Sequence, residues 1–172
     1  PILEGFAVGT FNKEELVANA NNIWSRCWSL NSGLPYNRRL PVDYPNTENV
    51  FRAIKKSYFL KKRGFNEDEG YTDDSSLSKK LNLRSVNAVG AISYHYNPST
   101  LVEVFFSARW IGRGKTYHPN IFNFLRFSPI NSIRVGAKYL LHGAPIMIFL
   151  FKLVYDAGVF VGIFFSNNKT YK

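Results

Sequence analysis

The sequence predicts a mainly β protein, a jelly-roll-like β-sandwich that carries one or two helices from its N-terminal third. Aromatic residues make up 16% of the 172 residues, and rings suit the pleated, half-buried surface of a strand. From Ser85 onward, apolar runs of strand length alternate with turn residues. The length suits one domain with its own core. We therefore expect a single domain over 1–172, with a helix- and loop-containing part, 1–84, and a strand-rich basic part, 85–172.

The N-terminal third contains the predicted helices. Segment 12–28, "NKEELVANANNIWSRCW", places apolar residues at helical spacing and begins with an asparagine that suits an N-cap. Segment 34–50 contains three prolines and predicts an extended loop. Segment 46–63 predicts a second helix, although its end, 57–63, is equally compatible with a strand. The acidic segment 66–80 predicts a surface loop.

The C-terminal half contains the predicted strands, which are 86–96, 101–110, 132–142, 145–155 and 158–166. Segments 142–145 and 155–158 have the composition of turns. The last two strands are apolar on both faces, which is typical of strands buried between layers. The apolar run that contains them is interrupted by Lys152 and Asp156, so we do not expect a membrane-spanning helix.

Positive charge is concentrated in the second part of the chain. The formal net charge is +10, yet residues 1–74 carry 10 basic and 10 acidic side chains. Residues 75–172 carry 12 basic and 2 acidic ones. Such a field attracts phosphate-bearing partners, either nucleic acid or an anionic membrane.

Cysteine usage and the N-terminus bear on localisation. Cys27 is the one cysteine, so no internal disulfide forms, and its neighbours Trp24 and Trp28 favour a buried apolar role for it. The first ten residues, "PILEGFAVGT", do not have the pattern of a signal peptide. We expect a secreted or virion-associated protein.

Segment 107–127, "SARWIGRGKTYHPNIFNFLRF", alternates basic residues with rings and is the predicted binding surface. Rings at the headgroup level beside cations suit a membrane with anionic or phosphocholine headgroups. The same pattern suits unpaired bases on a phosphate backbone, and the plainer alternative places the phenylalanines in the core. The predicted surface comprises Arg109, Trp110, Arg113, Lys115, Tyr117, Phe122, Phe124 and Arg126.

A catalytic alternative uses residues close together in the sequence. Glu103 would act as a general base, His95 or His118 as the acid, and Arg109 as the clamp for the phosphorane charge, which together describe a metal-independent ribonuclease. The strand register decides whether these side chains share a face. No histidine pair has ligand spacing and no glycine-rich phosphate loop opens a helix, so we predict no metal and no cofactor. The sequence favours binding over catalysis.

Segment 88–110, "AVGAISYHYNPSTLVEVFFSARW", resembles the central strand pair of the actinoporins, which are small basic pore-forming toxins. The matching residues are Ala88, Val89, Gly90, Tyr94, Thr100, Leu101, Val104, Phe106 and Ser107. Segment 121–127 stands where that family carries its headgroup-binding rings. The resemblance implies a β-sandwich that binds lipid headgroups and forms pores. The family's Pro-aromatic-Asp step is replaced by Ala108-Arg109-Trp110, and its Arg-Gly-Asp tripeptide is missing.

Three functions follow from the sequence. The first is a membrane-binding β-sandwich, with pore formation by a toxin as its extension. The second is a structural or assembly protein, such as a small viral capsid subunit that forms homo-oligomers and binds nucleic acid. The third is the ribonuclease toxin.

Overall fold

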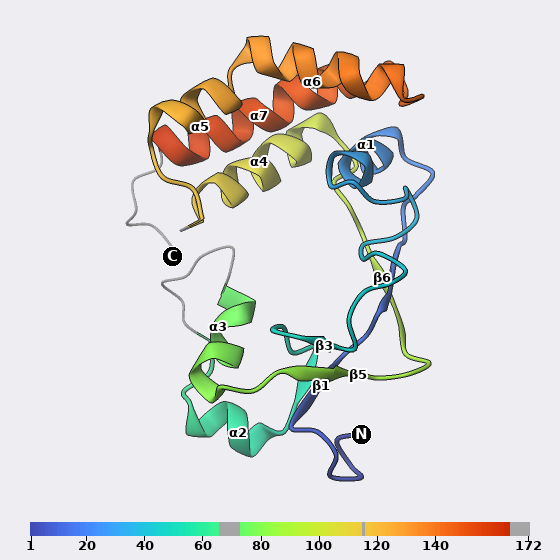
Figure 1. Ribbon diagram of the computed structural model, residues 1–172, viewed down its shortest axis with the longest axis vertical. Coiled ribbons are helices and arrows are strands. Elements are labelled where there is room, and N and C mark those ends of the chain that lie inside the picture. The colour runs from blue at the N-terminus through green and yellow to red at the C-terminus, as the bar shows by residue number, and fades with distance from the viewer. Residues whose placement is uncertain (66–72, 115, 166–172) are drawn as a thin grey trace. The chain divides into compact units, whose positions relative to one another are not determined.

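The computed structural model describes residues 1–65, 73–114 and 116–165 (Figure 1). Of these, 46% are helical and 12% lie in strands, and the sheets are small. The predicted β-sandwich is therefore wrong, and so is the sandwich that the actinoporin resemblance implies. The C-terminal half, where five strands were predicted, is mainly helical.

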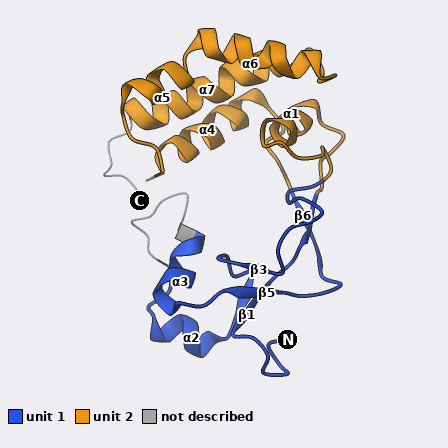
Figure 2. Ribbon diagram, viewed as in Figure 1, with its two compact units in different colours: residues 1–16, 38–95 blue, residues 17–37, 96–172 orange. Residues whose placement is uncertain are grey.

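The chain divides into two compact units, which Figure 2 distinguishes by colour. Unit 1 comprises 1–16 and 38–95, and unit 2 comprises 17–37 and 96–172. Unit 2 is thus built from two separate stretches of chain. In the sequence, residues 38–95 of unit 1 lie between them.

Unit 1 contains a sheet of short strands in the order β3-β5-β1-β4. Strand β1 pairs antiparallel with β4 and parallel with β5, and β5 pairs antiparallel with β3. A Cβ atom on Gly9 would lie 2.4 Å from the Phe51 ring and 2.6 Å from the Ala53 carbonyl oxygen, so β1 and β4 pair only with glycine there. The strands are β1 (Gly9–Phe11), β3 (Thr47–Glu48), β4 (Ala53–Ile54) and β5 (Ser85–Asn87).

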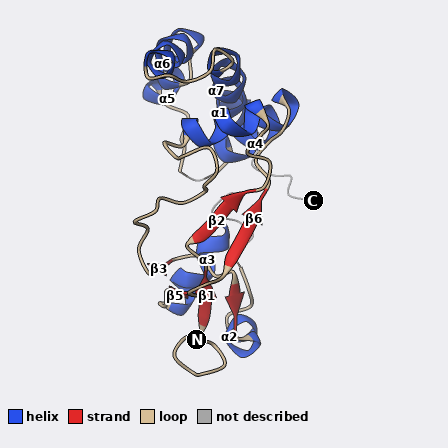
Figure 3. Cartoon of the chain, turned by 90° about the vertical axis from the view of Figure 1, so that its right-hand side faces the viewer, coloured by secondary structure: helices blue, strands red, loops and turns tan. Residues whose placement is uncertain are grey.

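Two helices and a strand pair complete unit 1. The strand pair is β2 (Glu14–Val17) with β6 (Ile92–His95), visible in Figure 3. The helices are α2 (Lys56–Lys61) and α3 (Asp73–Leu81). The buried apolar residues of this unit are Phe11, Phe51 and Leu77.

The N-terminal predictions need correction. The predicted helix 12–28 begins as strand β2, and its helical part is α1 (Ile23–Asn31). The N-cap is Asn22, whose side-chain oxygen accepts from Trp24 N at 2.9 Å. Residues 46–63 form β3, β4 and α2 rather than one helix. In the predicted loop 66–80, the residues from 73 onward belong to α3. Residues 66–72 lie outside the described residues.

Unit 2 is a helical bundle in which α7 is the central helix, flanked by α4 and α6 (Figure 1). Helix α1 packs against α4 and α7, and α5 packs against α6. Besides α1, the helices are α4 (Leu101–Gly112), α5 (Ile121–Arg126), α6 (Pro129–Leu141) and α7 (Ile148–Phe165).

Capping residues explain why predicted strands fold as helices. The side chain of Thr100 accepts from Glu103 N at 3.2 Å, which starts α4 where strand 101–110 was predicted. Asn120 caps α5 in the same way. Ser128 accepts from Asn131 N at 3.3 Å ahead of a proline in the first turn, which starts α6 in place of strand 132–142. Each cap satisfies backbone donors that a helix leaves open at its start.

The last two predicted strands, 145–155 and 158–166, form the single helix α7. The turn predicted at 155–158 lies inside that helix. The turn predicted at 142–145 is present between α6 and α7, where Gly143 adopts a φ of 83°. Of the described residues, α7 is the one helix with the length and composition to cross a membrane, and 33% of it is buried inside the protein. The expectation that this segment does not span a membrane stays a prediction.

Backbone contact between α4 and α7 holds the centre of unit 2. A Cβ atom on Gly112 would lie 2.3 Å from the Val159 carbonyl oxygen. A Cβ atom on Gly162 would lie 2.3 Å from the Arg109 carbonyl oxygen, and one on Gly158 would lie 2.5 Å from another α4 carbonyl. Small residues four apart on each helix allow this approach, as in the helix pairs of membrane proteins.

The core of unit 2 forms where α1 meets this helix pair. Cys27, Val104, Ile148 and Phe151 are buried together, and the Trp28 ring meets the Phe151 ring edge-on at 6.3 Å. Burial raises the pKa of the Cys27 thiol to about 11. The predicted apolar role of Cys27 is thus confirmed.

Two asparagines join the separate stretches of unit 2. The side chain of Asn19 donates to the Asn97 carbonyl oxygen at 2.7 Å and accepts from Asn97 N at 3.0 Å. The buried side chain of Asn97 donates to Ser29 Oγ at 3.0 Å. These bonds attach the start of the second stretch to α1 and to the turn before it.

One buried ion pair lies within apolar α7. Lys152 Nζ lies 2.8 Å from Asp156 Oδ1, and Asp156 is 1% exposed. The hydroxyl of Ser132, on α6, donates to Asp156 Oδ2 at 2.7 Å. The carboxylate is therefore satisfied on both oxygens, and it links α6 to α7.

We expect Gly158→Ala to destabilise unit 2. Alanine adds about 1 kcal/mol of helix propensity, but the overpacking against the α4 backbone costs roughly 1–3 kcal/mol. The matched control is Gly136→Ala on α6, whose Cβ would meet only the movable ring of Phe149 at 2.9 Å. Urea unfolding followed by circular dichroism measures both variants. Equal midpoints for the two variants would contradict the close crossing.

We expect Asp156→Leu to destabilise the protein by about 3–5 kcal/mol, because it leaves the Lys152 ammonium buried without its partner. The double variant Lys152→Met/Asp156→Leu removes both charges and should be clearly more stable than the single variant. Ser132 retains an acceptor in either case, since its hydroxyl lies 2.9 Å from the Ser128 carbonyl oxygen. Urea unfolding of the single and double variants tests the coupling, and additive losses would show that the two charges act independently.

Candidate functional site

The four residues of the catalytic alternative do not all share one element. His95 ends β6 in unit 1, whereas Glu103, Arg109 and His118 belong to unit 2. Glu103 lies in the first turn of α4, where its carboxylate accepts from Ser99 N at 2.6 Å. Arg109 lies six residues further along, which is about 9 Å up the helix axis and about 120° away from Glu103 around it. In this structure the side chain of Glu103 thus accepts a hydrogen bond from the backbone just before α4.

His95 lies instead among charged residues of unit 1. The pKa of His95 lies below the ordinary value, mainly because of partial burial and next because of the positive charge of Arg39. The negative charge of Glu15 opposes this shift, and the positive charge of Arg52 adds to it. Glu15 is nearly buried and pairs with Arg52 at 3.1 Å. This environment favours neutral His95. Neither arginine was selected by the sequence analysis, because they precede His95 by many residues.

The predicted binding residues occupy α4, α5 and the segment between them. Trp110 and Phe124 are exposed at 38% and 48%, and Phe122 is exposed at 79%. Tyr117 is half-buried and packs edge-on against the Phe127 ring at 5.5 Å. Phe124 is exposed but also contacts the Phe160 ring at 5.6 Å. Rings of this segment therefore serve both core and surface.

The predicted cations have several roles. Arg126 is exposed, and its guanidinium lies 5.4 Å from the centre of the Phe127 ring. The backbone N–H of Arg113 caps the end of α4. Arg109 is half-buried, with its Nε buried and without a hydrogen-bond partner. Lys115 lies outside the described residues.

The larger finding is a set of exposed apolar side chains, of which the sequence analysis selected only Trp110, Phe122 and Phe124. Exposed apolar side chains occur on α4, α5 and α6 and around the start of α7, and Phe122 and Leu141 are among the most exposed. On α4 the exposed residues recur every fourth position, which aligns them on one helix face. We call this set the apolar helical surface: Val102, Phe106, Trp110, Ile121, Phe122, Phe124, Leu125, Ile130, Ile133, Leu140, Leu141, Ile146, Met147 and Leu150.

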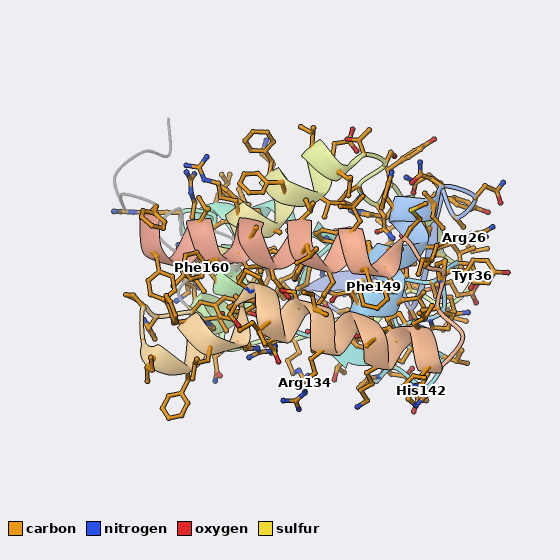
Figure 4. All side chains as sticks on the ribbon, turned by 90° about the horizontal axis from the view of Figure 1, so that it is seen from above. Arg26, Tyr36, Arg134, His142, Phe149 and Phe160 are labelled. Atoms are coloured by element: carbon orange, nitrogen blue, oxygen red, sulfur yellow. The ribbon has the colours of Figure 1, made fainter. Side chains whose placement is uncertain are left out.

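Basic residues accompany this surface. Unit 2 contains 10 Lys and Arg but only 2 acidic residues, Glu103 and Asp156. Asp156 is buried in its ion pair. Arg126, Arg134 and Lys138 are exposed on α5 and α6, and Arg134 extends away from α7 in Figure 4. Cations and apolar side chains thus share the outer helices of the unit.

Within the described part of the chain, no group of three or more His, Cys, Asp or Glu side chains is placed to hold a metal ion. No protein-family model, curated protein or solved structure matches the chain.

We expect His95 to titrate below its ordinary pKa of about 6.5. Because the folded protein favours neutral His95, the free energy of unfolding should fall as the pH drops from the ordinary pKa of the histidine to its lowered pKa in the folded protein. Below the lowered pKa, His95 should cause no further loss of stability. Proton NMR titration of the histidine Cε1–H resonances, assigned with His95→Gln, measures the midpoint. Arg39→Gln should raise it, and a midpoint at or above that of denatured protein would refute the proposed environment.

Proposed function

We propose that this protein is membrane-associated and that unit 2 binds anionic lipid surfaces through the apolar helical surface. The observation that carries the proposal is the exposure of large apolar side chains on successive helices of one unit. The exposed side chains are adjacent along the chain at Ile121, Phe122, Phe124 and Leu125. Water-soluble monomers expose contiguous apolar patches of more than a few hundred Å² only rarely, and such patches mark protein or membrane contacts.

The charge of unit 2 favours an anionic bilayer as the partner. Its net formal charge is +8, from 10 basic and 2 acidic residues, whereas unit 1, with 12 basic and 10 acidic residues, carries +2. Each exposed cation near an anionic membrane adds about 1 kcal/mol of attraction. Cations on the outer helices therefore direct the apolar side chains toward a negative surface.

The apolar side chains supply the larger share of the binding energy. Full transfer of one Leu, Ile, Val or Phe side chain out of water is worth about 1.5–3 kcal/mol. Helix α5 alone exposes Ile121, Phe122 and Leu125 at 57% or more. A few partly inserted side chains are enough to hold the unit at the interface, with the basic groups at headgroup level.

Nucleic-acid binding and the capsid jelly roll fit these features less well. Nucleic acid is bound by cations and stacked rings, whereas many residues of the apolar helical surface are aliphatic and gain nothing from stacking on bases. A capsid jelly roll requires the β-sandwich that this chain does not form. Pore formation remains a prediction from the actinoporin resemblance, separate from surface binding.

Vesicle flotation tests the proposal. We expect the full chain to float with vesicles of phosphatidylglycerol and phosphatidylcholine, and to float less with pure phosphatidylcholine and at high salt. Ile121→Ser/Phe122→Ser should weaken binding at least about tenfold, since two exposed side chains lose about 1.5–3 kcal/mol each when fully inserted.

The matched control is Leu3→Ser/Val89→Ser in unit 1, which removes two side chains that are at least as exposed, 102% and 91%. The control should float like the parent chain. Absence of flotation with every composition at low salt, or equal loss in the two double variants, would overturn the proposal. Dye release measured on the same vesicles decides whether binding also forms pores.

A further inference from the structure

A pocket of about 240 Å³ opens between α7 and the α5–α6 segment of unit 2. Its walls are almost entirely apolar, with Phe124 and Phe127 on one side and Phe160 of α7 on the other. The pocket is larger than an apolar cavity of about 150 Å³ that admits benzene and smaller than the roughly 300–1,000 Å³ of drug-sized sites. Its size suits a slender apolar ligand.

One wall of the pocket follows the length of α7. Leu153, Ala157 and Val161 line it at four-residue intervals, so they form one row about 12 Å long on the helix face. Ala157 stands at the middle of the row and is exposed, which leaves room for a ligand above its methyl group. A narrow apolar row of this length matches an extended alkyl chain.

The polar atoms at the pocket are already satisfied. The Ser128 hydroxyl donates to the Leu125 carbonyl oxygen at 2.7 Å and accepts from Asn131 N. The Ser132 hydroxyl donates to Asp156 at 2.7 Å. A sugar or a nucleotide base requires partners that these side chains do not offer, whereas an alkyl chain requires none.

A cation stands beside this apolar pocket. The exposed guanidinium of Arg126 lies over the ring of Phe127, which is itself a wall of the pocket. A chain lying in the pocket would bring an anionic headgroup within the field of Arg126, in a unit of net charge +8. We propose that the pocket binds one alkyl chain of an anionic lipid, with Arg126 beside its headgroup. This inference rests on the proposed membrane function and specifies its ligand.

Dodecyl phosphate below its micelle concentration, titrated calorimetrically into the full chain, tests the pocket without a bilayer. We expect saturable one-to-one binding that weakens at least about tenfold with hexyl phosphate, because fewer methylenes are buried. Ala157→Trp fills the pocket and should weaken dodecyl phosphate binding at least about tenfold. Ala157→Ser, which keeps the space, is the matched control and should bind like the parent.

Arg126→Gln separates the cation from the pocket. It should weaken dodecyl phosphate binding while leaving the uncharged dodecyl maltoside unaffected. Circular dichroism and thermal unfolding establish that each variant is folded, and Ala157→Leu replaces Ala157→Trp should the larger ring unfold the unit.

Vesicle flotation of Ala157→Trp distinguishes this inference from the proposed function, because the variant retains Ile121, Phe122 and the cations and should still float. Absence of saturable dodecyl phosphate binding by the parent overturns the inference even if vesicles bind. Undiminished binding by folded Ala157→Trp overturns it as well. Probe binding that Ala157→Trp abolishes supports the pocket even if the parent never floats, in which case the proposed function alone falls.

Discussion

Direct backbone contact between α4 and α7 is the constraint on which unit 2 depends. At Gly112, Gly158 and Gly162, a single methyl group would meet a carbonyl oxygen of the facing helix at 2.5 Å or less. The approach places α7 against α4 on one side and leaves its other sides to α1, α6 and the apolar pocket. Because the small residues of both helices lie at this contact, their large apolar residues pack against α1 and α6 or face outward.

The buried carboxylate of Asp156 shows how an apolar helix accommodates charge. Lys152 neutralises it one turn earlier, and Ser132 supplies the remaining hydrogen bond from α6. A pair satisfied in this way costs far less to bury than a lone ion, so it does not prevent α7 from lying in apolar surroundings. The same pair fixes the rotation of α6 about α7, since only one face of α6 carries the serine. That rotation sets the outward direction of Arg134 and keeps the serine side of α6 beside the pocket.

Part of this structure was predictable from sequence. The buried state of Cys27 and the turn at 142–145 were foreseen, because each follows from a local property of the residues, although the turn joins two helices and not two strands. The C-terminal helices were missed because phenylalanine, valine and isoleucine were weighed as strand formers, although Thr100, Asn120 and Ser128 are N-cap residues. The spacing of Val102, Phe106 and Trp110 was a helical signal within a predicted strand. The crossing of α4 and α7 could not be foreseen, since it depends on residues about fifty positions apart. The pocket could not be foreseen either, because it forms where α7 meets the α5–α6 segment. The charged surroundings of His95 likewise arise from pairing between distant segments.

The hydrogen bonds between Asn19 and Asn97 join two stretches of chain that are synthesised at different times. Helix α1 leaves the ribosome early, yet its partners α4 and α7 follow only after the second stretch of unit 1 has been made. During that interval the Trp24 and Trp28 side chains have no core to enter, and contacts of such large sequence separation form slowly. The most apolar helix is also the last of the described helices to be synthesised, so the described part of unit 2 is completed only when α7 has been made. Until then its nascent chain exposes the kind of surface that chaperones, or a nearby bilayer, would engage.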